Sequence, residues 1–595
     1  EPGAMGEPLY QDVSSLYKAK GADVTIVGGR YGLSSKDTTP DQMLAVYKNL
    51  ALDTPKNDFT IGIVDDVTNT SLPKAEAIHT APEGQMSAEF WGMGSDGTVG
   101  ANKNSIKIIG HTTDLYCQAY FVYDSKKSGG LTQSHLRFGR NPIRSPYLIQ
   151  AADFVACHTP SYVTKYDMVK NLKEGGTFLL NCAWSDEDLD RHLPASMKRA
   201  LYAKKAKFYT INATAIARSI GLGNRTNTIL QAAFFKLLGI IPVEEAVKAM
   251  KEAIYKTYFI KKGQAVVDKN YASIDHGINE LHSVTIPENW KDAQDAPKQD
   301  KAPAFIKEVV NVMNRQEGEV LPVSTMTKYG LEDGTWPAGT TKYEKRGAAV
   351  EVPEWQTANC IQCNQCAYVC PHATIRPFAL TAEEAKNAPE AAKIVDVKAG
   401  KGKGTYQFTM AISPLDCMGC GVCIGVCPVN ALSMVPQEGE LAQQDVFNYC
   451  VAEVSEKKDM QDNTVKGSQF KQPMLEFSGS CAGCAETSYA RLVTQLFGDR
   501  MYISNATGCS SIWGGPAATS PYTTNKAGHG PAWANSLFED NAEHGFGMFI
   551  GQEKIREDLA DKTRELIAVE WARPELKEAA QKWLDTFTDG KANAE

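Results

Sequence analysis

Eight of the fifteen cysteines fall into two copies of one closely spaced pattern. The copies, each followed by proline, are Cys360-x2-Cys363-x2-Cys366-x3-Cys370 and Cys417-x2-Cys420-x2-Cys423-x3-Cys427. In runs of this spacing, three thiolates bind one 4Fe–4S cluster and the fourth binds a second cluster. The pattern therefore predicts one cluster on Cys360, Cys363, Cys366 and Cys427, and another on Cys417, Cys420, Cys423 and Cys370.

Disulfide bonds and structural zinc are the two alternatives for these cysteines. Disulfides belong mainly to exported proteins, and no charged-then-apolar signal segment is recognisable near Glu1. Structural zinc is bound by two pairs of ligands rather than by runs of four. The repeat also resembles the bacterial two-cluster ferredoxins. We therefore predict a module that carries electrons and needs an electron donor elsewhere in the protein.

Three further cysteines follow this module, as the pair Cys481-Ala-Gly-Cys484 and as Cys509. Alone, the pair could be a redox dithiol or half of a zinc site, and Cys509 could be a buried structural thiol. Beside two predicted clusters, a third cluster is the better interpretation, but a cubane needs a fourth ligand. No cysteine follows Cys509, so we expect that ligand to lie outside this sequence or not to be a thiolate. We expect the chain to be the middle part of a longer polypeptide.

Three segments in this region resemble the thiamine-diphosphate domain of pyruvate:ferredoxin oxidoreductases. They are Cys481-Ala-Gly-Cys484-Ala-Glu-Thr487, Gly508-Cys-Ser-Ser-Ile-Trp513 and Glu543-His-Gly-Phe-Gly547. The resemblance extends over essentially the whole chain, including the opening segment 1–10 and the loop 94–103. It implies a third cluster on Cys481, Cys484, Cys509 and a distant cysteine, and thiamine diphosphate bound with Mg²⁺. It also implies that the N-terminal substrate domain and the end of the thiamine domain lie outside this sequence.

A glycine-rich loop is the main signal of the region before the cysteine runs. Gly92-Met-Gly94-Ser-Asp-Gly97 matches G-x-G-x-x-G, a pattern that lets backbone amides approach phosphate at the start of a helix. Asp124, after the expected strand Leu115–Tyr123, could bind a nicotinamide ribose, and a plain structural turn is also open. The lysines that follow Asp124 favour a phosphorylated ligand, and the resemblance implies coenzyme A. The candidate residues that it gives are Asp96, Lys126, Lys127, Asn224 and Arg225.

Strand–helix–strand series predict the surrounding fold. They favour parallel sheets, so we expect a multidomain α/β protein with parallel-sheet domains and an inserted ferredoxin-like α+β domain that binds two clusters. The expected domains are an α/β domain resembling the transketolase C-terminal domain (1–84), a coenzyme A-binding α/β domain (85–290), a linker or small wrapping domain (291–337), the ferredoxin domain (338–454) and the N-terminal part of the thiamine domain (455–595).

Local patterns add several expectations. We expect strands at Ala22–Val27 and Phe59–Val64, with a helix at Gln42–Leu52 between them. Residues 305–313 and 552–595 have helical patterns, and we interpret the apolar stripes of the second segment as core. The basic stretch Lys398–Gly404 is either a solvated hairpin tip or a contact for an acidic partner. We interpret Cys117, Cys157, Cys182, Cys450 and the scattered histidines, His79, His111 and His158 among them, as structural core residues.

Composition limits the class of protein. Hydrophobic residues make up 43% and charged residues 22% of the 595 residues, which is typical of folded multidomain proteins and excludes wholesale disorder. The formal net charge of −8 argues against nucleic acid as a partner, because phosphate binding requires a basic face. No stretch has the ~18 consecutive apolar residues of a membrane helix. We therefore expect no nucleic-acid or membrane partner, and a cytoplasmic protein.

The resemblance implies a function for the complete protein. It is the oxidative decarboxylation of pyruvate with coenzyme A to acetyl-CoA and CO2, with electrons passing through three 4Fe–4S clusters to ferredoxin or flavodoxin. We expect Glu486 to contact thiamine; a surface carboxylate is the alternative. A homodimer is expected, and the fragment alone is not expected to be active. Another 2-oxoacid, such as 2-oxoglutarate or indolepyruvate, remains open, as does an electron-transfer module without its own catalysis.

Overall fold

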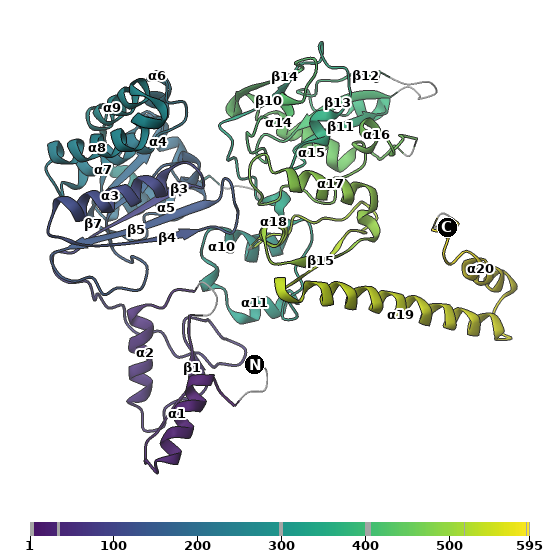
Figure 1. The fold of residues 1–595 in the computed structure, drawn as a ribbon, viewed down its shortest axis with the longest axis horizontal. Coiled ribbons are helices and arrows are strands. Elements are labelled where there is room, and N and C mark those ends of the chain that lie inside the picture. The colour runs from purple at the N-terminus through teal and green to yellow at the C-terminus, as the bar shows by residue number, and fades with distance from the viewer. Residues whose placement is uncertain are drawn as a thin grey trace.

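The structure is a computed structural model that describes residues 5–32, 36–296, 301–398, 406–457, 459–516, 518–590 and 592–593. Figure 1 shows a small N-terminal part, a large sheet domain and a body that carries the cysteine runs, from which a long helix extends. In the part of the chain that is described, no helix combines the length and the apolar composition needed to cross a membrane.

The N-terminal part contains less sheet than its sequence predicts. Helices α1 (Pro8–Ala19) and α2 (Pro40–Leu50) flank the two-residue strands β1 (Gly29–Arg30) and β2 (Phe59–Thr60), which pair in parallel. The predicted helix is present but begins at Pro40 rather than at Gln42, with Pro40 in its first turn and the Thr39 amide donating to Gln42 Oε1 at 3.3 Å. The strand predicted at Ala22–Val27 is wrong, because this segment pairs with no strand among the described residues and leaves Val24 51% exposed. A strand cannot exist without a neighbour to satisfy its amides.

The sheet domain contains seven strands in the order β4-β5-β3-β6-β7-β8-β9. Their bounds are β3 (Met86–Met93), β4 (Tyr116–Tyr123), β5 (Leu131–Gly139), β6 (Ala152–Cys157), β7 (Leu172–Asn181), β8 (Lys207–Ile211) and β9 (His282–Val284). The pairs β3/β6, β6/β7 and β7/β8 are parallel, and the others are antiparallel. The sheet is thus mixed, because β4 and β5 are joined by the short loop 124–130 and pair as a hairpin.

Helices bury both faces of this sheet. The helices of the domain are α3 (Thr98–Thr112), α4 (Asp186–His192), α5 (Ala195–Ala203), α6 (Ala213–Ser219), α7 (Asn227–Leu238), α8 (Val243–Lys262) and α9 (Gln264–Asn279). One core joins Phe90, Phe154 and Phe234 of α7, and a second core on the other face surrounds Trp290. α7 ends at Gly239, which adopts φ of +63°, a conformation that favours glycine.

A short irregular segment follows and leads into the cysteine-rich body. It contains a π-helical turn at Ile306–Val310, α10 (Asn311–Asn314) and α11 (Val323–Lys328), so the helix predicted at 305–313 is present. In Figure 1, α10 lies near the centre of the view and α11 lies below it. Ile306 and Val310 form a small core with Ala518, which lies more than two hundred residues further along the chain.

The cysteine-rich module is built around two small antiparallel sheets. β10 (Glu351–Trp355) pairs with β14 (Leu432–Pro436), and β13 (Gln407–Ile412) lies between β11 (Ile375–Leu380) and β12 (Val395–Asp396). The helices are α12 (Gln365–Tyr368), α13 (Ala382–Lys386), α14 (Val422–Gly425) and α15 (Gln443–Glu453). Of the basic stretch Lys398–Gly404, residues 399–404 lie outside the described residues.

The last part of the chain begins with a compact unit and ends in exposed helices. The unit contains α16 (Val465–Ser468), α17 (Ala485–Phe497), β15 (Tyr502–Ala506), α18 (Cys509–Gly514) and β16 (Ala532–Ser536), with β15 and β16 parallel. α19 (Asn541–Ala568) then extends away from the body to α20 (Pro574–Asp585), as Figure 1 shows. The interpretation of their apolar stripes as core is wrong, because Ile555 is 53% and Leu559 48% exposed. Helical spacing predicted the stripe correctly, but α19 projects beyond the packed body.

The remaining cysteines and histidines divide between core and surface. Cys157, Cys182 and Cys450 are buried as predicted, and Cys117 is half-buried against the first core. His158 is also buried, and burial lowers the pKa of its imidazole. His79 and His111 are exposed, so the prediction of a core position is wrong for them. His79 lies in a loop outside the sheets, and His111 lies on the solvent side of the last turn of α3.

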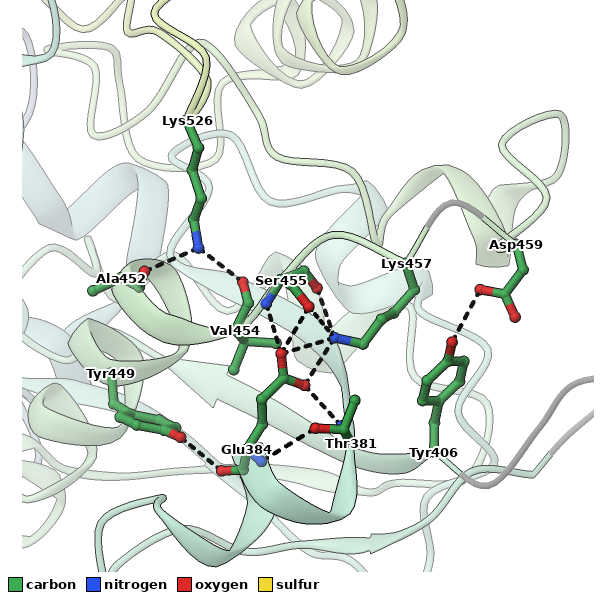
Figure 2. Close-up of polar contacts among 10 residues, drawn as sticks. All are labelled: Thr381, Glu384, Tyr406, Tyr449, Ala452, Val454, Ser455, Lys457, Asp459 and Lys526. Atoms are coloured by element: carbon green, nitrogen blue, oxygen red, sulfur yellow. Dashed lines mark hydrogen bonds and ion pairs between the residues drawn. The ribbon is translucent and has the colours of Figure 1, made fainter.

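Glu384 joins the cysteine-rich module to the segment that follows it (Figure 2). Its carboxylate accepts hydrogen bonds from the Lys457 ammonium at 2.8 Å and from the Ser455 and Thr381 amides at 2.9 and 2.7 Å. Burial acts to raise the pKa of Glu384, but these donors outweigh burial and hold the pKa at about 2. Further along the chain, Lys526 donates to the carbonyl of Val454 at 3.1 Å. The ionised carboxylate therefore fixes the exit of the chain from the module.

We predict that Glu384→Gln lowers the stability of this junction by ~1–2 kcal/mol, because an amide cannot replace a carboxylate that accepts from an ammonium and two amides. Limited proteolysis of the assembled protein should show faster cleavage next to Lys457. Glu390→Gln is the matched control, since Glu390 is exposed on the same module. Equal cleavage rates in the two variants would contradict the assigned role of Glu384.

Candidate functional site

The two cysteine runs adopt the same backbone geometry. Left-handed φ angles occur at Gln362 (+57°) and Asn364 (+61°) in the first run and at Gly419 (+64°) and Gly421 (+72°) in the second. The cost of this conformation at Gln362 is offset by its side chain, which donates to the Asp396 carbonyl at 2.8 Å. The sequence repeat is thus also a structural repeat, with left-handed residues at equivalent positions of the two runs.

The structure brings the first predicted set of cysteines together. Cys360, Cys363, Cys366 and Cys427 line one pocket, and its other walls are mainly apolar. Burial raises the pKa of the Cys366 thiol, and the neighbouring thiols of the set raise it further. Iron–sulfur clusters are bound by such thiolates in surroundings that limit solvent access. The residues present therefore fit a cluster of the predicted kind.

The second predicted set also converges across the repeat. Burial raises the pKa of the Cys417 thiol to about 12, with further contributions from the nearby Cys370 and Cys420 thiols. Burial is also the main cause of the raised pKa of the Cys423 thiol, with contributions from Cys370, Cys417, Cys366 and Cys420. Cys370, the last cysteine of the first run, therefore lies with the second run. This crossing is the arrangement that the spacing predicts.

Backbone amides point at sulfur atoms of both sets. The amide of Gln362 donates to Cys360 Sγ at 3.3 Å, and the amide of Gly419 donates to Cys417 Sγ at 3.4 Å. These two amides occupy equivalent positions in the repeat. Hydrogen bonds to cluster sulfurs stabilise negative charge and adjust the reduction potential, so both sites have the donors that a reducible cluster uses.

The third set is more open. Cys484 precedes α17, and Cys509 is the first residue of α18. The two helices are linked through Trp513 Nε1, which donates to Glu486 Oε2 at 3.3 Å. Cys481 and Cys509 are exposed, whereas Cys484 is half-buried. The structure thus places the three thiols at the N-termini of two linked helices, on an open face.

The loop that carries Cys481 and Cys484 packs on the second cysteine set. A Cβ added at Gly483 would lie 3.4 Å from Val422 Cγ2 and 3.7 Å from Cys420 Cβ. His372 is buried, with Nε2 3.2 Å from the Cys481 carbonyl oxygen and Nδ1 3.2 Å from that of Ser478. Burial lowers the pKa of His372 to about 4. The ring is thus neutral at pH 7, so only one of its two nitrogens can donate to a carbonyl, and it packs between the Cys370 segment and the Cys481 loop.

Arg491 on α17 completes this junction. Its guanidinium is buried and donates to the carbonyls of Cys370 at 3.0 Å and Tyr368 at 2.6 Å. Gln495 and Gln469 accept from the same group at 2.6 and 3.0 Å. Sequence reasoning missed both His372 and Arg491. The position of His372 directly after Cys370-Pro371 was the one available signal, whereas Arg491 lies on a helix with no motif of its own.

The glycine loop lies at the carboxyl end of β3 and meets two other predicted segments. The Gly94 amide donates to the Gly130 carbonyl at 2.7 Å, next to the loop that carries Lys126 and Lys127. A Cβ added at Gly97 would lie 3.1 Å from Cγ of Asn227, at the start of α7 and just after Arg225. The three loops that contain the five coenzyme A candidates are therefore neighbours in the fold.

The five coenzyme A candidates differ in how exposed their side chains are. Lys127, Asn224 and Arg225 are exposed. Asp96 accepts hydrogen bonds from the Met93 and Thr98 amides at 2.8 and 2.7 Å, so it shapes the glycine turn. 

Lys126 is buried rather than available at the surface. Its ammonium lies 3.0 Å from Glu344 Oε1 and 3.7 Å from Asp124 Oδ2. The buried cation therefore already has two carboxylate partners, which distinguishes it from its exposed neighbour Lys127.

Comparison with known proteins supports the family resemblance. Three protein-family models match this chain. The model described as "Pyruvate ferredoxin/flavodoxin oxidoreductase" matches residues 87–280, a model of a domain of unknown function matches residues 291–349, and a model of a 4Fe-4S dicluster domain matches residues 359–431. The chain is 52% identical over 600 residues to the pyruvate:ferredoxin oxidoreductase of Moorella thermoacetica and covers 51% of it. These matches confirm the predicted family resemblance.

Further relatives differ in their electron partners. The pyruvate-flavodoxin oxidoreductase of Enterobacter agglomerans is 52% identical over 604 residues, with 100% of this chain and 51% of the relative covered. The pyruvate dehydrogenase [NADP(+)] of Euglena gracilis is 46% identical over 600 residues, with 99% of this chain and 33% of that protein covered. The chain thus spans about half the length, or less, of the relatives it matches.

Proposed function

We propose that this chain supplies the coenzyme A-binding and electron-transfer parts of a pyruvate:ferredoxin or flavodoxin oxidoreductase. In the complete protein, pyruvate is decarboxylated and its acyl group passes to coenzyme A, while electrons leave through three 4Fe–4S sites. The contact of the Cys481–Cys484 loop with Cys420 is the observation that carries this proposal. It supports an electron path from a third site, near thiamine diphosphate and Mg²⁺, into the two sets of the cysteine-rich module.

The chain's own residues would hold the clusters in a fixed order. The Cys481, Cys484 and Cys509 set would receive electrons first, and Cys417, Cys420, Cys423 and Cys370 would form the next site because the Cys481 loop packs on it. Cys360, Cys363, Cys366 and Cys427 would then form the exit to ferredoxin or flavodoxin. Clusters supply one-electron redox chemistry when bound. His372 and Arg491 would fix the spacing between the first two sites.

Glu486 and the coenzyme A candidates have separate tasks in this proposal. Glu486 is exposed next to the third set and accepts from Trp513, so a carboxylate stays available beside the proposed thiamine site. Thiamine diphosphate, when bound, stabilises the charge that decarboxylation leaves on the substrate. Lys127, Asn224 and Arg225 would contact the phosphates of coenzyme A, and Asp96 would hold the glycine loop in shape. A homodimer remains part of the proposal.

Cluster content is the first test. Full-length protein prepared without oxygen should contain about twelve iron and twelve sulfide atoms per chain, from three clusters of four irons. Cys484→Ser should remove about four of each and leave the cysteine-rich module loaded. A wild-type content of about eight would exclude a third cluster.

Coenzyme A binding is the second test. Lys127→Ala should raise the KM for coenzyme A about tenfold, since a lost contact between an ammonium and phosphate contributes ~1.5–3 kcal/mol. Lys107→Ala, at an exposed position of α3, is the control. Lys126→Ala should instead lower stability, because it leaves Glu344 buried without its cation. An unchanged KM in Lys127→Ala would remove Lys127 from the proposed site.

The order of the sites is the third test. After a pulse of pyruvate, freeze-quench electron paramagnetic resonance on Cys481→Ala should show no reduction of the two clusters in the cysteine-rich module. In Cys420→Ala the third site should still be reduced, while turnover with ferredoxin collapses. If Cys481→Ala reduces the module at the wild-type rate, the proposed order is wrong.

A further inference from the structure

Three consecutive charged residues, Glu344, Lys345 and Arg346, contact three different parts of the molecule. They lie near the end of the segment 291–349, which matches only a domain of unknown function. Each side chain has a polar partner of its own. The partners belong to the sheet domain, to the cysteine-rich module and to the segment that precedes Cys481.

Glu344 binds the sheet domain through a buried ion pair. Its carboxylate lies 3.0 Å from the Lys126 ammonium, and both side chains are only 6% exposed. A buried pair of this kind is costly to separate, because each charge would lose its partner in a place that water does not reach. The Lys126–Gly130 loop is thereby held against the segment 291–349.

Lys345 binds the cysteine-rich module next to a predicted cluster ligand. Its ammonium lies 2.5 Å from Asp416 Oδ2, and Asp416 directly precedes Cys417. Asp416 also accepts from Ser413 Oγ at 2.7 Å. The adjacent backbone adds a further link, since the Gly347 amide donates to the Leu415 carbonyl at 2.8 Å. The start of the second cysteine run is therefore fixed to the same triplet.

Arg346 connects the Lys126–Gly130 loop with the segment that precedes Cys481. Its guanidinium donates to the Ser128 carbonyl at 3.0 Å and to the Ser478 carbonyl at 3.3 Å. These two loops also contact one another directly, because the Lys127 amide donates to the Gly479 carbonyl at 2.8 Å and the Ala482 amide to Ser128 Oγ at 3.0 Å.

The packing at Gly129 shows how closely these loops meet. Gly129 has φ of +65°, and a Cβ there would lie 2.7 Å from Cε of Met418, between Cys417 and Cys420. The sheet-domain loop thus packs closely on the Met418 side chain of the second cysteine run, and the positive φ at this position favours glycine.

We propose that Glu344, Lys345 and Arg346 are positioning residues that set the separation between the Cys481–Cys484 loop and the Cys417–Cys423 run, and couple both to the sheet domain. This inference rests on the proposed function, because it assumes that electrons cross between these two loops. Electron tunnelling falls off exponentially with distance. A small displacement of the Cys481 loop would therefore slow transfer without removing any cluster ligand.

The test uses full-length, cluster-loaded protein and the variants Arg346→Met and Arg346→Lys. Arg346→Met keeps the length of the side chain but cannot donate a hydrogen bond, and Arg346→Lys restores the charge and one donor group. Lys342→Met is the matched control, since Lys342 is an exposed cation of the same segment. Iron content is measured first, and it should equal that of the wild type in all variants.

Two readouts need no substrate. In dithionite-reduced Arg346→Met, the magnetic interaction between neighbouring clusters in the electron paramagnetic resonance spectrum should weaken. Hydrogen exchange at the Lys127 and Ala482 amides should become about tenfold faster, because the charged hydrogen bonds that hold their loops together are lost. Arg346→Lys should recover part of both effects, and Lys342→Met should change neither.

The third readout is electron transfer after a pulse of pyruvate. The site at Cys481 should be reduced at the wild-type rate in Arg346→Met, while transfer onwards into the cysteine-rich module slows about tenfold or more. Unchanged cluster interaction and unchanged exchange in Arg346→Met would overturn the inference, even if pyruvate reduces the enzyme normally. If pyruvate reduces no cluster in the wild type, the proposed function fails, while the substrate-free readouts still decide the positioning role. If Arg346→Met does not fold, the same readouts on Arg346→Lys decide it.

Discussion

The buried guanidinium of Arg491 imposes the constraint on which the arrangement of cysteine loops depends. Arg491 is 2% exposed, and burial lowers its pKa to about 10, which still leaves it charged at pH 7. A cation in that position is tolerated only if its donors are paired. The acceptors come from the Cys370 segment, from α17 itself and from Gln469, so α17 can occupy only one position relative to the first cysteine run.

Much of the remaining geometry follows from this constraint. α17 begins immediately after Cys484, so fixing the helix against the Cys370 carbonyl also fixes the start of the helix and the cysteine pair before it. His372 and Ser488 strengthen the same contact, with Ser488 Oγ donating to the Val369 carbonyl at 3.0 Å. Backbone carbonyls are the main acceptors here. The junction thus depends on the path of the chain more than on the identity of the facing side chains.

On the other side of the Cys481 loop, charged side chains connect loops from different parts of the chain. There the ion pair of Lys126 with Glu344 and the contact of Arg346 with Ser128 join parts of the chain that lie more than two hundred residues apart. The Lys126–Gly130 loop, which by sequence is a ligand-binding candidate, thereby has two roles in the fold. Its buried lysine holds neighbouring loops together, and its exposed lysine is the one that the proposed function assigns to a phosphorylated ligand.

The sequence by itself determined the features that depend on local spacing. The two cysteine runs, the glycine turn after β3 and the presence of α2 all follow from residues within a few positions of one another. Tertiary structure alone decided which helical stripes are buried, that β4 and β5 make the large sheet mixed, and that Ala22–Val27 forms no strand. It also decided that Lys126 is buried while Lys127 is exposed, although the two are adjacent and chemically alike. The physical reason is that burial and pairing depend on partners that are distant in the sequence, such as Glu344 for Lys126 and the Cys370 carbonyl for Arg491. The spacing of residues along the chain does not show which distant group will lie beside a given side chain.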